Sequence, residues 1–194
     1  MALELHLLSE IHPIPALLVG YGTSTIFRLS IDPTEVGSGV MSREVRVDWV
    51  RKPGGGLPQH FMREISWREV PALILDACLK WKSTKNNQQT TEEAAVGVLA
   101  MLIDDLENAE ILSVLQIGSG GDFLITIRET SVEIQAECSG ILVDEKGYET
   151  TQRLKDKGKQ VLTKSTSGFA SITTFSHSKS QEVRCKISFV GASI

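Results

Sequence analysis

The chain has 194 residues, which allows one large domain or two small ones and is long enough for a substantial hydrophobic core. Hydrophobic residues make up 41% of the chain and charged residues 23%, a composition typical of soluble globular proteins. The net charge of −4 excludes a general positive field for nucleic acid, so any nucleic-acid contact requires a local basic patch.

The three cysteines, Cys78, Cys138 and Cys185, lie far apart among apolar neighbours, and none belongs to a C-x-x-C motif. This usage indicates buried reduced thiols in a reducing compartment. No apolar run approaches the roughly 18 residues needed to span a membrane. The first residues carry Glu4 and Glu10 and lack a basic segment, which excludes a typical signal peptide. We therefore expect a cytoplasmic protein without a membrane partner.

The N-terminal part of the chain predicts a few strands. Residues 3–8 fit either a strand or the start of a short helix, and Pro13 and Pro15 then favour extended backbone. Residues 23–31 and 43–50 are predicted as strands, the second because apolar and charged residues alternate along it. No motif in these strands points to chemistry.

A helix is predicted over residues 66–81, because Ser66 opens a capping box and an apolar stripe follows it. The polar run 82–89 has no periodicity and predicts a linker. We therefore expect an N-terminal region of strands with one amphipathic helix over residues 1–85, and a second domain over residues 90–194.

The second domain is predicted as helix, three strands, helix and two strands, which indicates a mixed α/β (α+β) fold built on a mixed sheet. Its first helix begins at a capping box of Thr90 and Glu93, a Gly-rich turn joins its first two strands, and Gly140 ends the third. The predicted helices cover residues 90–106 and 145–162, and the predicted strands cover residues 111–117, 122–128, 131–138, 170–175 and 182–190.

Asp122 and Glu137 lie on strands that we expect to form a hairpin. The apolar faces of the two strands must match, since a slip of one residue would bury the acids. The admissible registers place Asp122 opposite Glu137 or opposite Ser139, and in the second case the two acids are diagonal neighbours about 7–8 Å apart. Either register brings both carboxylates within reach of one divalent cation. The alternative is a turn aspartate beside a solvated polar strand face.

A third acid, Glu92, lies on the apolar side of the first helix of this domain. It precedes Ala95, Leu99 and Ile103 at helical spacing, whereas Glu93 is explained as a cap. A helix packed on the sheet would direct Glu92 toward the two strand acids.

This order of elements and acids resembles the core of the PD-(D/E)xK nuclease-like superfamily. Three short motifs are also similar to those of a family of uncharacterised bacterial proteins, which carry an E-x-x-A-I-G helix, a G-T-G-x-D-Y turn and an E-V-S-G-I strand. In this chain the corresponding motifs are E-x-A-A-V-G from Glu92, G-x-G-G-D-F from Gly118 and E-C-S-G-I from Glu137. The resemblance covers about residues 90 to 190.

The resemblance implies a metal-dependent nuclease-like domain, either active or retaining only nucleic-acid binding. Asp122 and Glu137 would bind Mg²⁺, and Glu92 would support the metal or its water molecules. In such nucleases the metal activates a water and stabilises charge on the phosphate oxygens. The alternative is a non-catalytic protein-interaction module on the same fold.

The superfamily places a lysine two residues after the strand glutamate, where this chain has Ser139. The following helix would then supply the amine from Lys155 or Lys157, and Lys155 completes the expected catalytic set with the three acids. The same helix carries the one dense basic run of the chain, which predicts contacts with the phosphates of DNA or RNA. An exposed lysine-rich helix without a partner is the alternative. The basic residues are Arg153, Lys155, Lys157 and Lys159.

Overall fold

The structure is a computed structural model that describes residues 2–30, 41–51, 57–67, 87–115, 122–142, 148–176 and 182–192. Its strands are β1 (Leu3–Glu4), β2 (Met41–Val50), β3 (Gln59–Trp67), β4 (Ala109–Val114), β5 (Phe123–Ile127), β6 (Val132–Leu142), β7 (Ser167–Phe175) and β8 (Val183–Gly191). Its helices are α1 (Leu8–Ile11), α2 (Pro15–Leu29), α4 (Asn87–Glu107) and α5 (Tyr148–Lys164), preceded by a 3-10 turn at Leu5–Leu7.

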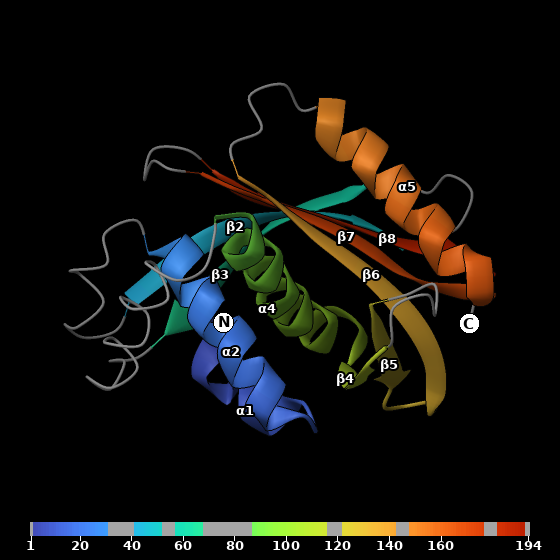
Figure 1. Ribbon diagram of the computed structural model, residues 1–194, viewed down its shortest axis with the longest axis horizontal. Coiled ribbons are helices and arrows are strands. Elements are labelled where there is room, and N and C mark those ends of the chain that lie inside the picture. Colours follow the sequence, from blue (N-terminus) through green and yellow to red (C-terminus); the bar gives the residue numbers. More distant parts are fainter. Residues whose placement is uncertain are drawn as a thin grey trace.

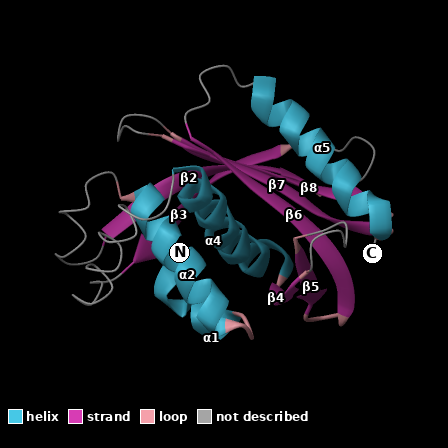
Figure 2. Ribbon diagram, viewed as in Figure 1, coloured by secondary structure: helices cyan, strands magenta, loops and turns pink. Residues whose placement is uncertain are grey.

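The strands form one mixed sheet in the order β1-β3-β2-β8-β7-β6-β5-β4. The pairs β1–β3, β2–β8 and β6–β7 are parallel, and the remaining pairs are antiparallel. Helices α2 and α4 lie on one face of the sheet and α5 lies on the other (Figure 1). The strands form a single twisted layer between these helices (Figure 2). The predicted mixed α/β fold is confirmed, including the order helix, three strands, helix and strand from α4 to β7.

The strands of both predicted domains belong to this one sheet, because β2 pairs with β8. The rings of Trp49 and Phe169 lie 5.8 Å apart, and those of Phe169 and Phe189 lie 5.4 Å apart. These contacts join β2, β7 and β8, and one hydrophobic cluster extends from Leu3 to Phe189. The described residues of the two predicted regions, 1–85 and 90–194, therefore share a core.

Helix α4 is the central helix because its middle is apolar on every side. Each residue from Ala94 to Ile103 is buried. Gly97 allows α2 to approach closely, since a Cβ at this position would collide with the Thr25 hydroxyl. That hydroxyl lies 3.1 Å from the Ala94 carbonyl oxygen and 2.8 Å from the Tyr21 carbonyl oxygen. Small and polar side chains thus form the contact between the two helices.

The predicted strand over residues 23–31 is wrong, because the chain is helical in α2 up to Leu29. Threonine and isoleucine favour strands, but tertiary contacts override this preference: Ser24 and Thr25 use their hydroxyls to contact α4. Pro15 does not extend the backbone here. It is the first residue of α2, where a missing N–H costs no helical hydrogen bond.

Two predicted helix starts also differ from the structure. Ser66 belongs to β3, a strand that we did not predict, so the helix does not begin at this residue, and the rest of the helix predicted to residue 81 lies outside the described residues. Helix α4 begins at Asn87, so Thr90 is not its N-cap and residues 87–89 are not part of a linker.

Strand β6 continues past Gly140, which was predicted to end it. The glycine is explained by the packing of α4, because a Cβ at Gly140 would collide with the carbonyl oxygen of Thr91. A side chain at this position would therefore push the start of α4 away from the sheet. The described part of helix α5 begins at Tyr148, and both its predicted start at residue 145 and the predicted Gly-rich turn at residues 118–121 lie outside the described residues.

Strands β5 and β6 pair with Phe123 opposite Ala136 and Ile125 opposite Ile134, so their apolar faces match as predicted. Extended by one residue, this register places Asp122 beside Glu137, which is the first of the two predicted registers.

The edge strand β4 is shielded by the segment that follows α1. The Ile111 N–H donates to Nδ1 of His12 at 2.9 Å, and Arg128 donates to the Ile11 carbonyl at 3.0 Å. His12 is buried, and burial lowers the pKa of its imidazole to about 4. The bond from Ile111 occupies a backbone group that an exposed edge strand would offer to another chain.

Cys138 and Cys185 are buried free thiols, as predicted, whereas Cys78 lies outside the described residues. Within the described part of the chain, no helix has the length and apolar character needed to cross a membrane.

Candidate functional site

The predicted acids meet where β6 extends beyond its neighbour β5. Strand β5 pairs only with residues 132–136 of β6. Past that point the carboxylate of Asp122 accepts the Cys138 N–H at 3.0 Å, and the carboxylate of Glu92 accepts the Gly140 N–H at 2.8 Å. Two acids from different elements therefore take over the hydrogen bonds of the unpaired edge.

Asp122 is held in place by its backbone as well as by its side chain. Its N–H donates to the Ala136 carbonyl at 2.8 Å, and its carbonyl accepts the Leu115 N–H at 2.9 Å. The carboxylate nevertheless remains 41% exposed. It is thus fixed toward β6 while still open to solvent.

Lys157 of α5 lies against both strand acids. Its Nζ is 2.6 Å from Oε2 of Glu137 and 3.8 Å from Oδ2 of Asp122. The Glu137 side chain is only 8% exposed and the Lys157 side chain 24%. Three charged groups from separate elements therefore converge in a partly buried position.

The ion pair affects its two partners differently. Burial raises the pKa of the Glu137 carboxyl, and the charge of Asp122 adds to this effect, so the pKa stays raised despite the bond from Lys157. Burial lowers the pKa of the Lys157 ammonium, but the hydrogen bond to Glu137 and the charges of both acids outweigh it and raise the pKa. Both pKa values are therefore raised: that of Glu137 because desolvation and the charge of Asp122 outweigh the ion pair, and that of Lys157 because the two acids outweigh desolvation.

Glu92 reaches the same strand from α4. Besides the Gly140 N–H it accepts the hydroxyl of Ser139 at 3.1 Å, and that hydroxyl accepts a 3.4 Å hydrogen bond from Nη1 of Arg153. Ser139 occupies the position where the superfamily motif has a lysine. Its short buried side chain connects Glu92 to Arg153 instead.

The structure brings Glu92, Asp122 and Glu137 together and places Lys157, not Lys155, beside them. Lys155 is exposed and makes no hydrogen bond or ion pair with the described residues. Two residues correspond to a rotation of about 200° around a helix, so Lys155 points away from the side of α5 that carries Lys157. Lys159 is also exposed and lies 3.3 Å from Asp156.

Further residues near the site were missed by the sequence analysis. Ser24 donates to the Glu93 carboxylate at 2.6 Å, and the Tyr21 ring packs edge-on against Phe123. Burial raises the pKa of the Tyr21 phenol, with contributions from the charges of Glu93 and Asp122. The helical position of these α2 side chains was hidden by the strand-like composition that follows Tyr21.

The donor set fits Mg²⁺ only in part. Within the described ranges, no group of three or more His, Cys, Asp or Glu side chains is placed to hold a metal ion. Asp122 and Glu137 offer two carboxylates, one of them exposed. Mg²⁺ commonly binds through one or two carboxylates and completes its octahedron with water and substrate phosphates. The pair therefore suits Mg²⁺ better than a metal that requires a full protein cage.

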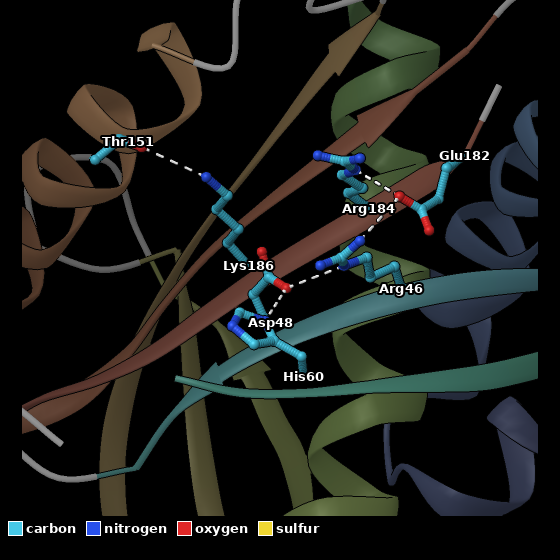
Figure 3. Close-up of polar contacts among 7 residues, drawn as sticks. All are labelled: Arg46, Asp48, His60, Thr151, Glu182, Arg184 and Lys186. Carbon is cyan, nitrogen blue, oxygen red and sulfur yellow. Dashed lines mark hydrogen bonds and ion pairs between the residues drawn. The ribbon is translucent and has the colours of Figure 1, made fainter. Parts of the chain in front are cut away.

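A second set of polar side chains lies on the face of the sheet that α5 covers (Figure 3). Ion pairs connect neighbouring members at 2.6 to 3.8 Å, and a 3.4 Å hydrogen bond joins β8 to α5. Arg46 and Arg184 are compensated by Asp48 and Glu182, and exposed pairs of this kind contribute only about 0–1 kcal/mol each, whereas Lys186 contacts the neutral Thr151 hydroxyl. Its members are Arg46, Asp48, His60, Thr151, Glu182, Arg184 and Lys186.

No protein-family model, curated protein or solved structure matches this chain.

Proposed function

We propose that the chain is a metal-dependent phosphodiesterase that acts on nucleic acid. The observation that carries this proposal is the convergence of Lys157 of α5 with Glu137 of β6 and with Asp122, the residue before β5, at 2.6 and 3.8 Å. A structural ion pair needs only two charges, whereas two acids with one amine is the set that the PD-(D/E)xK resemblance requires. The order helix, three strands, helix and strand from α4 to β7 also agrees with this resemblance.

The acids and the amine have distinct roles in this proposal. Asp122 and Glu137 would hold Mg²⁺, and Glu92 would orient its water molecules from the opposite side of β6. When bound, Mg²⁺ polarises the phosphodiester and lowers the pKa of a coordinated water. Lys157 donates a charged hydrogen bond toward the phosphate, which stabilises negative charge that develops there. It thereby supplies from α5 the amine that Ser139 cannot supply.

A non-catalytic interaction module is the second candidate. It is favoured by the bonds from the Cys138 and Gly140 N–H groups to Asp122 and Glu92, which protect the edge of β6 without any chemistry. Under this alternative the acids are needed for stability alone.

Metal binding and cleavage separate the two functions. Isothermal titration with Mg²⁺ and Mn²⁺ and cleavage of plasmid DNA and RNA should both be positive for the purified chain. Asp122→Asn keeps an acceptor for the Cys138 N–H but removes a charge, so it should lose metal binding and cleavage while remaining folded. Glu133→Gln, which changes an exposed acid of the neighbouring strand β6, is the matched control. A chain that neither binds metal nor cleaves either substrate contradicts the proposal.

A further inference from the structure

We propose that a polynucleotide lies along the side of α5 that faces β6, and that Arg153 binds one of its phosphates beside the carboxylates. This inference rests on the proposed function and names the substrate-binding residue of the same site. It also distinguishes among the basic residues of α5, which the sequence presents as one group.

Arg153 and Lys157 form a row along this side of α5. They are four residues apart, which places them on one helix face about 6 Å apart along its axis. Their contacts follow the same order on β6, since Lys157 meets Glu137 and Arg153 meets Ser139 two residues further on. Alternate residues of a strand point to one face. Both cations therefore line one continuous strip beginning at the acids.

The charge of Arg153 is oriented but not neutralised. Its one contact with the described residues is the 3.4 Å bond to the Ser139 hydroxyl, which itself donates to Glu92. Lys157, by contrast, is bound by two carboxylates. An arginine carries five N–H donors in a planar fork that fits phosphate oxygens in pairs. Arg153 thus keeps donors for a phosphate while Ser139 fixes its direction.

Two other cations of α5, Lys155 and Lys159, are poorly placed for the same strip. Lys155 lies about 200° around the helix from Lys157. Lys159 likewise lies about 200° from Lys157 and is paired with Asp156. These two lysines share the charge and exposure of Arg153 without its contacts, which makes them matched controls.

Binding is best measured separately from cleavage. Fluorescence anisotropy with labelled single-stranded DNA, duplex DNA and RNA, in EDTA and over a range of salt concentrations, reports phosphate contacts alone. Arg153→Gln should weaken binding about tenfold and reduce the salt slope by about one, whereas Lys155→Gln and Lys159→Gln should change affinity less than about twofold. Arg153→Lys should restore part of the loss.

A double-mutant cycle tests the role of Ser139 as a positioning residue. Ser139→Ala should weaken binding in the wild-type background and have no effect in the Arg153→Gln background. Equal effects in both backgrounds would show that Ser139 does not act through Arg153, and would overturn that part of the inference.

The two proposals fail in different ways. If the chain binds Mg²⁺ and cleaves nucleic acid, but Lys155→Gln weakens binding as much as Arg153→Gln, the placement of the polynucleotide is wrong and the nuclease activity stands. If the wild-type chain neither binds nor cleaves any of the three nucleic acids, both proposals fall.

Discussion

The ammonium of Lys157 lies 2.6 Å from the carboxylate of Glu137, inside the space that the two strand acids share. A cation is therefore already present at the position that we propose for Mg²⁺. Any metal that uses Glu137 and Asp122 must compete with this amine for the carboxylate oxygens.

Replacing Lys157 by methionine should strengthen divalent-cation binding while it lowers cleavage. The change removes a positive charge that competes for the same oxygens, and it also removes the amine that contacts the phosphate. Titration calorimetry should give a Kd for Mn²⁺ at least about tenfold lower than in the wild type, a change of about 1.4 kcal/mol. Lys155→Met is the control and should leave the Kd unchanged. A weaker or unchanged Mn²⁺ affinity in Lys157→Met would show that the amine and the metal do not compete.

Glu137→Gln should make the folded chain more stable at neutral pH, although it removes part of the proposed site. The pKa of Glu137 is raised by burial, so its ionised form is disfavoured in the fold. This carboxyl therefore costs stability as the pH rises from 4.5 through its folded pKa, and glutamine avoids that cost. Urea unfolding should show no difference between the two proteins near pH 4 and a more stable variant at pH 7.5. A variant less stable at pH 7.5 would indicate that the pair with Lys157 stabilises the fold.

The His12 imidazole should make the fold sensitive to mild acid. Its pKa is lowered to about 4 by burial, against an ordinary value of 6.5, so as the pH falls the unfolded chain takes up the proton first. The contribution of His12 to the free energy of unfolding is fully present above pH 6.5. It decreases by about 3 kcal/mol as the pH approaches 4. His12→Asn keeps an acceptor for the Ile111 N–H and does not titrate. It should be less stable than the wild type at pH 7.5, with a smaller loss between pH 7 and pH 4.5 in urea unfolding, whereas parallel pH curves for the two proteins would exclude this role.

Gly140→Ala should destabilise the chain by about 1–3 kcal/mol, because the added methyl group collides with the Thr91 carbonyl and displaces the first turns of α4. The displacement also moves Glu92, so metal affinity should fall together with the melting temperature. Gly158→Ala is the control, since its Cβ would lie 3.2 Å from a Val190 methyl group, a contact that a small shift relieves. Equal melting temperatures for Gly140→Ala and the wild type would contradict the close packing of α4 on β6.

The positions of Asp122 and Glu137 were predictable because strand periodicity leaves little freedom. Once the apolar faces of β5 and β6 had to match, the acids could meet in only two registers, and the chain adopts one of them. The position of Glu92 was predictable for a related reason, since helical spacing assigned it to the side of α4 that packs against the sheet.

The choice between Lys155 and Lys157 depended on the rotation of α5 about its axis. The buried residues Gly158 and Val161 mark the side that faces the sheet. Lys157 lies four residues before Val161 and shares that side, so the signal was present in the sequence. Helix α2 could not be predicted in this way. The hydroxyls of Ser24 and Thr25 gain their hydrogen-bond partners only when α4 is in place.

The central position of β8 constrains the order in which the chain can fold. Among the described residues, the strands of 41–67 and those of 109–175 form two groups that are joined within the sheet only through β8, which pairs with β2 on one side and with β7 on the other. During synthesis the earlier strands must therefore wait with one edge unpaired until residues 183–191 have left the ribosome. Pairing over so long a sequence separation is slow and exposes strand edges to other chains. Nascent chains of this protein are thus expected to depend on chaperones until the last strand is inserted.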